Sequence, residues 1–455
     1  MIRRIDLRGG PRRTASDYRN LVPRSPFDVD AAADLVRPTL AEIREHGDAA
    51  VLACARRDAP ELTAEGLAVP VQATERALAA LAPDVRAACE ESIRRLQLAS
   101  QAELEQDTVV SIAPGATVTQ RMVPYHRVGV YVPAGVTALP STVLMTVVPA
   151  QVAGVSEIAL ASPALPEFGS APHPTVLALA ALLGITEVYA VGGVGAVGMF
   201  AYGTDRCAPT EFVAGPGRIT TVAAKRLVRG LVGIDSEAGP TEIAVLADDS
   251  ARPELVAADL ISQAEHDEMA ASVLITASER LADAVAAQLA VQVPESKHAS
   301  RIAAALDGEQ SGIVLVDDLD RGLEVTNAYA AEHVEIHTEN PAEVAARVRN
   351  AGAIFVGSAS PVSLGDYCAG SNHVLPTGGC ACHSSGLSVR SYTKAVHVVQ
   401  YDQRALEQVA EHVQVLAEAE DLPAHGMAVR RRLEADGPGA SGTASGRQDN
   451  EEVDG

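Results

Sequence analysis

Two residues of one short segment have side chains of the kind that bind metal ions. Gln263 and His266 lie in Ser262-Gln263-Ala264-Glu265-His266, at the end of a helix expected at about residues 253–265. Residues three apart share one face of a helix, so the Gln carbonyl and the imidazole can converge on one ion. A neutral Gln is an uncommon ligand, and a solvated polar helix end would show the same spacing. The spacing alone leaves both interpretations open.

A second segment, Ala331-Glu332-His333, places a carboxylate beside an imidazole where an apolar strand begins. Such a pair can accept and pass on protons. The alternative is an exposed loop pair, because ligand crevices of α/β sheets lie more often at the carboxyl ends of strands. Glu332 and His333 are therefore candidate acid/base residues.

Two further segments could contribute ligands. Residues 362–379 are rich in glycine and contain Asp366 and His373, residue types that bind metals or polar substrates. A loop of this length inside a compact domain is usually functional. Near the end of the chain, Glu420 and His425 could reach a site, although taken alone that segment is better explained as the close of a C-terminal helix.

Two motif-like strings carry less weight. Gly193-Val194-Gly195-Ala196-Val197-Gly198 matches the glycine pattern of dinucleotide-binding turns and follows a predicted strand, but the acidic residue expected about 20 positions later is missing. Cys380-Ala381-Cys382-His383 lacks the cysteine spacing of a structural zinc site, so its thiols are predicted to be free or buried.

Short β-branched runs alternate with Ala/Leu-rich helical patterns around these segments. The predicted strands are 128–132, 157–160, 187–191, 211–213, 243–246, 272–276, 312–316, 334–337 and 353–356. The predicted helices are 83–101, 174–183, 219–229, 253–265, 279–289, 321–329 and 342–349. Strands alternating with helices predict parallel sheets covered on both faces, so we expect two Rossmann-like, doubly wound α/β domains.

Composition excludes several classes of function. The 455 residues carry a net charge of −23 and only 3% aromatic side chains, which opposes binding of nucleic acid. No apolar run reaches the ~18–20 residues of a membrane helix, and the start has no apolar stretch behind its basic residues, so we expect a cytoplasmic protein. The six cysteines are expected to be reduced thiols. Small-molecule chemistry is the class that remains.

Taken together, the segments resemble the histidinol dehydrogenase family over roughly residues 1–433. The matching strings occur in family order and are Arg127-Val128-Gly129-Val130-Tyr131-Val132-Pro133, Gly239-Pro240-Thr241-Glu242, Ser262-Gln263-Ala264-Glu265-His266, Ala331-Glu332-His333, Gly365-Asp366-Tyr367, Ser371-Asn372-His373-Val374-Leu375-Pro376-Thr377 and Pro423-Ala424-His425. The resemblance implies NAD-dependent oxidation of L-histidinol through L-histidinal to L-histidine, the final steps of histidine biosynthesis.

The resemblance also implies roles for residues. One zinc ion per subunit would be held by Gln263, His266, Asp366 and, from the partner subunit of a homodimer, His425. Such an ion would chelate the substrate's imidazole and amine and so act mainly as a template. His333 would take the alcohol proton, and Glu332 would activate the water that hydrates the aldehyde. The zinc ligands and His333 would also contact the substrate, together with Thr241, His373 and Glu420. The residues implied to contact NAD are Tyr131, Gly195 and Arg218.

The chain departs from the family pattern mainly around the cofactor. Gly195 stands where Gln is usual, Arg218 where Asn is usual and Ala134 where Gly is usual, while Thr241 replaces Ser and keeps its hydroxyl. We expect an altered or weaker NAD site on a complete catalytic set, with Arg218 able to bind a phosphate instead. The alternatives are a related zinc- and NAD-dependent dehydrogenase of another small alcohol, and a non-catalytic metal-binding protein.

The elements and the resemblance together predict a domain order. Residues 1–23 form an N-terminal arm, and residues 24–130 with 241–387 form a first α/β domain that carries the metal and catalytic residues. Residues 131–240 form a second, NAD-binding α/β domain. Residues 388–436 form a helical dimerisation segment that reaches the partner subunit, and the Gly- and Ser-rich residues 437–455 form a disordered tail.

Overall fold

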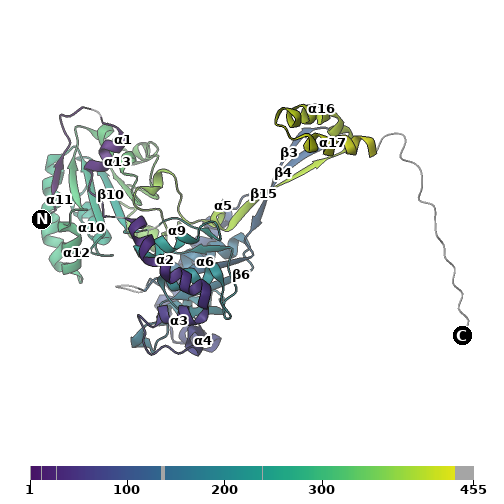
Figure 1. Cartoon of the computed structure of the whole chain (residues 1–455). Helices are drawn as coiled ribbons and strands as arrows, with labels where there is room; N and C mark the ends of the chain where they lie inside the picture. Colours follow the sequence, from purple (N-terminus) through teal and green to yellow (C-terminus); the bar gives the residue numbers. More distant parts are fainter. Residues whose placement is uncertain (1, 12, 27, 135–138, 238, 436–455) are drawn as a thin grey trace, which may run out of the picture. The chain divides into compact units, whose positions relative to one another are not determined.

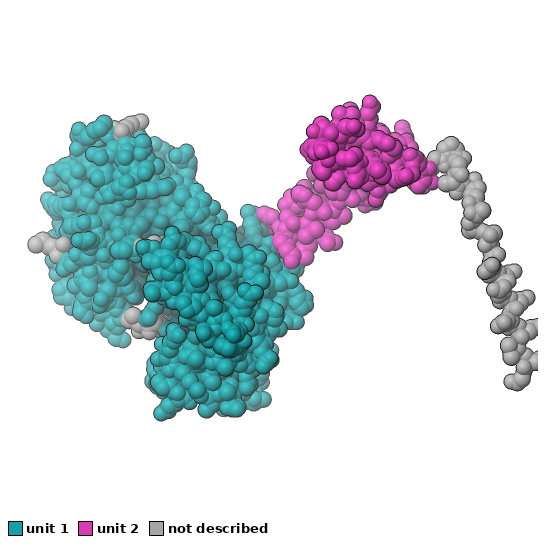
Figure 2. All heavy atoms as spheres, in the orientation of Figure 1, with its two compact units in different colours: residues 1–104, 124–393 teal, residues 105–123, 394–455 magenta. Residues whose placement is uncertain are grey.

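The structure is a computed structural model, and it describes residues 2–11, 13–26, 28–134, 139–237 and 239–435. The chain divides into two compact units, which Figure 2 shows in different colours. The first unit comprises residues 1–104 and 124–393, and the second comprises residues 105–123 and 394–455.

The first unit contains two six-stranded sheets (Figure 1). The first sheet has the order β1-β12-β11-β10-β13-β14, and all its neighbouring strands are parallel. Its strands are β1 (Arg4–Asp6), β10 (Glu242–Ala247), β11 (Ala271–Thr276), β12 (Gly312–Leu315), β13 (His333–His337) and β14 (Ala353–Val356). Its helices are α1 (Ala15–Leu21), α10 (Pro253–Ala264), α11 (Glu279–Glu295), α12 (Ala299–Asp307), α13 (Leu319–Tyr329), α14 (Pro341–Ala345) and α15 (Val362–Tyr367). Side chains of α1 and α13 form the core on one face, and those of α10, α11 and α12 form the core on the other.

The second sheet has the order β2-β7-β6-β5-β8-β9, parallel except where β2 meets β7. Its strands are β2 (Ala68–Val69), β5 (Arg127–Tyr131), β6 (Glu157–Ser162), β7 (Glu187–Ala190), β8 (Phe212–Ala214) and β9 (Gly233–Ile234). Its helices are α2 (Val29–His46), α3 (Asp48–Ala55), α4 (Val71–Ala80), α5 (Pro83–Glu103), α6 (Ser141–Ala153), α7 (Pro174–Leu182), α8 (Gly193–Tyr202) and α9 (Ile219–Val228). The two doubly wound α/β sheets predicted from the sequence are confirmed, and α14 is shorter than predicted.

The two sheets repeat one topology although the sequence shows no internal repeat. In each sheet three successive strands run to one side, β10 to β12 and β5 to β7, and the next strand, β13 or β8, pairs on the other side of the first. The connections therefore diverge between β10 and β13 and between β5 and β8. Ligands of α/β sheets commonly bind at the carboxyl ends of strands where connections diverge in this way.

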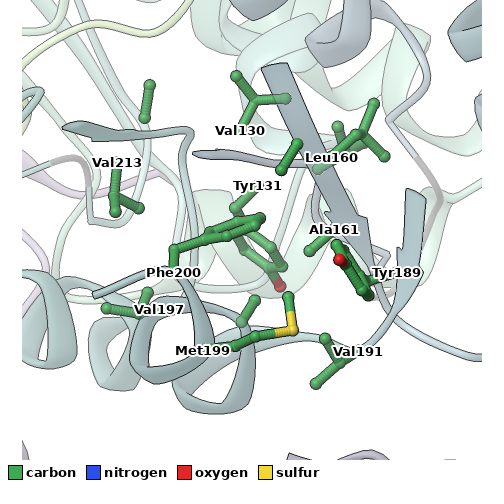
Figure 3. Close-up of a cluster of buried hydrophobic side chains, with 14 of the residues drawn as sticks. Val130, Tyr131, Leu160, Ala161, Tyr189, Val191, Val197, Met199, Phe200 and Val213 are labelled. Carbon is green, nitrogen blue, oxygen red and sulfur yellow. The ribbon is translucent and has the colours of Figure 1, made fainter. Parts of the chain in front are cut away.

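The core of the second sheet explains a glycine in the middle of β5. Figure 3 shows side chains of β5, β6, β7 and β8 packed against Met199 and Phe200 of α8. A Cβ atom on Gly129 would lie 2.5 Å from the ring of Phe200. Glycine at this position therefore lets α8 approach β5 closely, which is the use of a glycine inside a strand.

The first residues of the chain differ from the predicted arm. β1 pairs with β12 at the edge of the first sheet, and Leu7, Tyr18 and Val22 are buried. α1 begins at a capping box, in which the side chains of Thr14 and Asp17 accept hydrogen bonds from each other's backbone amides. This segment is part of the first sheet. Its few apolar positions are separated by charged residues, which conceals the periodicity.

Residues 24–130 also differ from the predicted assignment to the first sheet. α2 packs against α8 and α9, and β2 pairs with β7. Val36 and Leu40 of α2 belong to the core of the second sheet. An amphipathic helix does not encode which sheet it covers, so the sequence pattern could not make this assignment.

The second unit contains a three-stranded sheet and two helices. The sheet has the order β15-β4-β3, with β3 (Thr108–Ala113), β4 (Ala116–Pro124) and β15 (Thr393–Tyr401). The helices are α16 (Gln403–Ala419) and α17 (Pro423–Ala435), which pack against each other. The predicted C-terminal segment thus includes a strand that joins a hairpin from residues 105–123, while the predicted tail lies outside the described residues. Within the described part of the chain, no helix combines the length and apolarity needed to cross a bilayer.

Candidate active site

The side chain of Glu332 is buried just before β13, next to the start of β10, with 6% of its surface exposed. Its Oε2 accepts a hydrogen bond from Thr241 Oγ1 at 2.6 Å and another from the backbone amide of Glu242 at 3.0 Å. Gln263 Nε2 donates to the same Thr241 hydroxyl at 2.6 Å, which directs the hydroxyl proton toward Glu332. Burial raises the pKa of Glu332 well above its usual range. The carboxylate form is therefore a stronger base than an exposed Glu.

The adjacent His333, the first residue of β13, is also buried, with 4% of its surface exposed. Its Nδ1 lies 3.7 Å from Glu332 Oε2 and has no hydrogen-bond partner among the described residues. Burial lowers the pKa of His333 to about 3, and the nearby His266 and His373 act in the same direction. The imidazole is therefore neutral near pH 7 and able to accept a proton.

Three of the four predicted metal ligands lie in the first unit, on α10, just after it, and on α15. Gln263 is fully buried, and its Oε1 has no hydrogen-bond partner in the described part of the chain. His266 Nδ1 lies 3.2 Å from the carbonyl oxygen of Ser262, so a proton on Nδ1 leaves Nε2 available as a ligand. Asp366 interacts electrostatically with His266, and burial raises the pKa of Asp366. An unpartnered buried oxygen, an imidazole and a carboxylate are a donor set that fits a Zn²⁺ ion.

The glycine-rich loop after α15 brings His373 to the same group of residues. His373 Nδ1 lies 3.2 Å from the carbonyl oxygen of Asp366, and its Nε2 lies 3.2 Å from Thr142 Oγ1 on α6. Asn372 Nδ2 donates to a backbone carbonyl of α6 at 2.7 Å. Burial lowers the pKa of His373 to about 4. The loop is therefore fixed against a helix of the second sheet while it carries a polar ring toward residues of the first.

Two residues that the sequence did not single out support Glu332. Glu242, the first residue of β10, is buried, and its Oε2 lies 3.0 Å from Arg24 Nε. The Arg24 guanidinium in turn stacks 4.2 Å from the ring centroid of Tyr329. A second buried carboxyl group beside Glu332 favours proton binding there, while the arginine compensates its charge. The signal for Glu242 was present in the sequence, as a charged residue at the head of an apolar strand.

Two of the three residues predicted to contact NAD come together at the diverging connections of the second sheet. Tyr131 is the last residue of β5. Its hydroxyl group hydrogen-bonds with the backbone of Gly193 and the side chain of Thr221, and it interacts electrostatically with Arg218. Burial raises the pKa of Tyr131. Arg218 is exposed and is the N-cap of α9. The turn between β8 and α9 runs close to β5, since a Cβ on Gly215 would lie 2.0 Å from the Tyr131 carbonyl oxygen. Glycine turns leading into helix N-termini at the ends of parallel strands fit a dinucleotide.

Gly195, the third of these residues, is packed differently. It is buried within α8, where a Cβ would lie 2.7 Å from Val191 Cγ2 and 2.9 Å from Cys54 Cβ. Gly198 is equally close-packed, with a Cβ position 2.7 Å from Ile43 Cδ1. These glycines of the G-x-G-x-x-G string allow α8 to pack on its neighbours, whereas Gly193, with φ of 52°, forms the turn that opens the helix. The structure thus gives the last two glycines a packing role.

Glu420 and His425 belong to the second unit and are not brought together with the other site residues within one unit. Glu420 is the C-cap residue of α16, His425 lies in the first turn of α17, and both are exposed. Cys380 and Cys382 lie in a short 3-10 turn of the first unit, and all six cysteines are free thiols.

Known proteins resemble this chain in sequence and in structure. A family model described as histidinol dehydrogenase matches residues 22–433. The histidinol dehydrogenase of Thermobifida fusca is 59% identical over 433 residues, which is 95% of this chain and 98% of that protein. The one from Streptomyces avermitilis is 58% identical over 435 residues, with the same coverage. A crystal structure of histidinol dehydrogenase from Elizabethkingia anophelis superposes with a TM-score of 0.87 at 29% identity, covering 95% of this chain and 98% of that one.

The match spans nearly the whole chain in sequence and in structure, and its residues include the buried Glu332–His333 pair and the unpartnered oxygen of Gln263. The chain therefore belongs to the histidinol dehydrogenase family.

Proposed function

We propose that this protein is a zinc-dependent dehydrogenase that oxidises L-histidinol through L-histidinal to L-histidine, with NAD as the hydride acceptor. The observation that supports this most directly is the convergence of two kinds of group near the amino ends of β10 and β13. A proton-accepting pair, Glu332 and His333, lies there beside a metal-type donor set that includes the unpartnered Gln263 Oε1. Relatives that are 58–59% identical carry the name of this activity.

The proposed zinc ligands are Gln263, His266 and Asp366, completed by His425 of the partner subunit. A bound Zn²⁺ would hold the imidazole and amine nitrogens of the substrate, and a bound NAD⁺ would accept a hydride in each of the two oxidations. Thr241, His373 and Glu420 are the proposed substrate contacts. Thr241 already donates to Glu332 and accepts from Gln263, so it connects the proposed base with a proposed metal ligand.

In the first oxidation His333 is proposed to accept the proton of the hydroxyl group, while the carbon that bears this group would lose a hydride to NAD⁺. The ring is suited to this step because burial keeps it neutral, with a pKa of about 3. The proton acquired would be stabilised by the Glu332 carboxylate, whose Oε2 lies 3.7 Å from His333 Nδ1. The neutral His333 ring would thus accept the alcohol proton, and the neighbouring Glu332 carboxylate would stabilise the resulting positive charge.

In the second oxidation water adds to the aldehyde, and the hydrate loses a hydride to give the acid. Glu332 is proposed to take the proton of this water, because burial has raised its proton affinity. The Thr241 hydroxyl and the Glu242 amide hold Oε2 in place by hydrogen bonds of 2.6 and 3.0 Å. Two neighbouring bases therefore match a reaction that releases protons in two steps.

The proposed NAD site is the turn region at the ends of β5 and β8, with Tyr131, Gly195 and Arg218. Tyr131 and Arg218 line this region. Gly195 instead lies on a buried face of α8, packed against the side chains of Val191 and Cys54. The exposed guanidinium of Arg218 at the start of α9 suits a phosphate of the dinucleotide. At position 218 the cofactor would therefore be bound by a charged guanidinium, whereas the family usually has the neutral amide of Asn there.

The proposal includes a cytoplasmic homodimer in which the second unit serves the partner's site. β15 is exposed along almost its whole length, and it carries apolar side chains such as Val398 and Val399. β3 adds Val109 and Ile112 to the exposed apolar surface of the same sheet. A small sheet with so much exposed apolar surface is expected to pack against another molecule, here a second copy. The free thiols suit a reducing compartment.

Turnover of amino alcohols tests the proposed substrate. The zinc-loaded protein should reduce NAD with L-histidinol far faster than with an amino alcohol that lacks the imidazole, such as L-leucinol, because only histidinol offers two nitrogens to the metal. Equal rates on both alcohols, or activity only on another alcohol, would favour the related dehydrogenase. No oxidation of any alcohol with zinc bound would favour a non-catalytic protein.

A further inference from the structure

A cluster of three buried ionisable side chains lies in the first unit outside the residues proposed for the reaction. They are Asp259 of α10 and Glu335 and His337 of β13. Each offers an oxygen or nitrogen atom, and these atoms all lie within 4.8 Å of one another. Burial of three ionisable groups costs free energy unless they compensate one another. We refer to these three residues as the buried cluster.

Residues of the buried cluster lie on the same elements as residues of the proposed site, a few positions away. Asp259 precedes Gln263 by four residues on α10, so the two share a helix face. Glu335 follows His333 by two residues on β13, so the two point to the same face of the sheet. The core on this face contains residues of α10 together with Val362, the first residue of α15. The buried cluster therefore lies on the same face as the proposed zinc ligands.

The contacts of the cluster join three elements. His337 Nε2 lies 3.3 Å from Glu335 Oε2 and 3.6 Å from Asp259 Oδ2. Glu335 Oε1 accepts a hydrogen bond from the backbone amide of Val362 at 2.9 Å. α15 begins at Val362 and carries Asp366 one turn later. One carboxyl group, that of Glu335, thus connects the strand of the proposed bases to the helix of Asp366, and its neighbours connect the same strand to α10.

The protonation of the cluster is compatible with a dry interior. Burial raises the pKa of Asp259 and of Glu335, and the two carboxyl groups hydrogen-bond each other. Burial also lowers the pKa of His337. Two carboxyl groups that share a proton, beside a neutral imidazole, can be buried without a cation between them. The cluster can therefore act as a fixed connection in its own right.

We propose that the buried cluster is a positioning device for the metal site. It fixes α10 and α15 against β13, and so sets the distance between the zinc ligands of the two helices. This inference rests on the proposed zinc site. Asp259, Glu335 and His337 are positioning residues in this view, since they touch neither substrate nor metal.

Zinc affinity of the metal-free protein, titrated against a chromophoric chelator, tests the proposal. Glu335→Leu removes the acceptor for Val362 and the bond to Asp259, and it should weaken zinc binding by about tenfold or more, as expected for a residue behind the ligands. Glu335→Gln keeps an acceptor and a donor and should bind zinc nearly as tightly as the unchanged protein. Asp259→Leu and Asp259→Asn form a second pair, to be used if Glu335→Leu does not fold.

Ile336→Ala is the matched control, because Ile336 is buried on the opposite face of the same strand. It should lower the Tm and leave the zinc affinity unchanged. If Glu335→Leu binds zinc as tightly as Ile336→Ala does, the positioning role is wrong although the zinc site stands. If the unchanged protein binds no zinc, the proposed site itself fails. If it binds a second zinc ion that Glu335→Gln loses, the cluster is a metal site and not a positioning device.

Discussion

At the scale of single residues, burial gives two neighbouring side chains different properties. Burial makes Glu332 a stronger base and keeps His333 neutral, and both groups lie within 3.7 Å of each other. The residue types of this pair were visible in the sequence, as was the spacing of Gln263 and His266. Their burial was not, because it depends on how β13 pairs with β10 and on the distant Arg24 and Glu242.

Separate substitutions of the two bases should affect different oxidations. Glu332→Gln should slow the oxidation of supplied L-histidinal by roughly 10²–10⁴-fold, the usual contribution of a general base. His333→Asn should slow the oxidation of L-histidinol by a similar factor and affect that of histidinal less. Stopped-flow measurement of NADH from each substrate checks this, with metal analysis as the control for retained zinc. Identical losses on both substrates would contradict the division of roles.

The buried His333 should also make stability depend on pH in a predictable direction. Its pKa falls from 6.5 to about 3 on folding, so below pH 6.5 the unfolded chain binds a proton that the folded chain does not. This contribution to stability is complete above pH 6.5 and is lost as the pH falls toward 3. Between those limits the metal-free protein should lose up to about 1.4 kcal/mol per pH unit more than His333→Asn does. Urea unfolding at a series of pH values measures this, and parallel curves for the two proteins would refute it.

At the scale of elements, the sequence predicted β5 to β8, β10 to β14 and seven of the helices, because buried parallel strands are short apolar runs with few competing interpretations. It missed the two-residue strands β2 and β9 and the helix α6 between β5 and β6. It did not predict β1, where charged residues separate the apolar ones, or that α2 covers the second sheet. Nor did it predict the buried cluster, although Glu335 and His337 are charged or polar residues at alternate positions of an apolar strand. A pattern along one strand does not show what packs against it.

The glycine in β5 provides a test of the packing of α8. Gly129→Ala should destabilise the protein by about 1–3 kcal/mol, because the added Cβ would lie 2.5 Å from the Phe200 ring. Gly312→Ala in β12 is a suitable control, since the nearest atoms there are 3.4 Å away. Chemical denaturation of both variants measures the difference. Equal stability of the two variants would show that α8 does not pack on β5 as described.

At the scale of the whole molecule, the proposed active site requires two copies of the chain. The proposed ligand His425 and the proposed substrate contact Glu420 are exposed residues of the second unit, and the exposed apolar strand β15 belongs to the same unit. Sequence resemblance alone indicated that these residues act in a partner's site. The structure of one chain adds the exposed surfaces that such an exchange needs.

Subunits with complementary defects should restore each other. In a purified heterodimer of His425→Ala with Glu332→Gln subunits, one site combines an intact Glu332 with the intact His425 of the partner subunit, and the other site carries both defects. Such a heterodimer should show about half of the unchanged dimer's rate, because a twofold dimer has two equivalent sites. Each homodimer should be nearly inactive. A heterodimer as inactive as the homodimers would place His425 in its own chain's site.

The most direct test of the central claim is the number of NADH molecules formed for each molecule of L-histidinol consumed, with and without zinc. We expect two NADH and one L-histidine per histidinol, with no free aldehyde released. Both products should be lost when a chelator removes zinc and should return when zinc is added back. One NADH with release of the aldehyde, or an unchanged yield in the metal-free protein, would contradict this expectation.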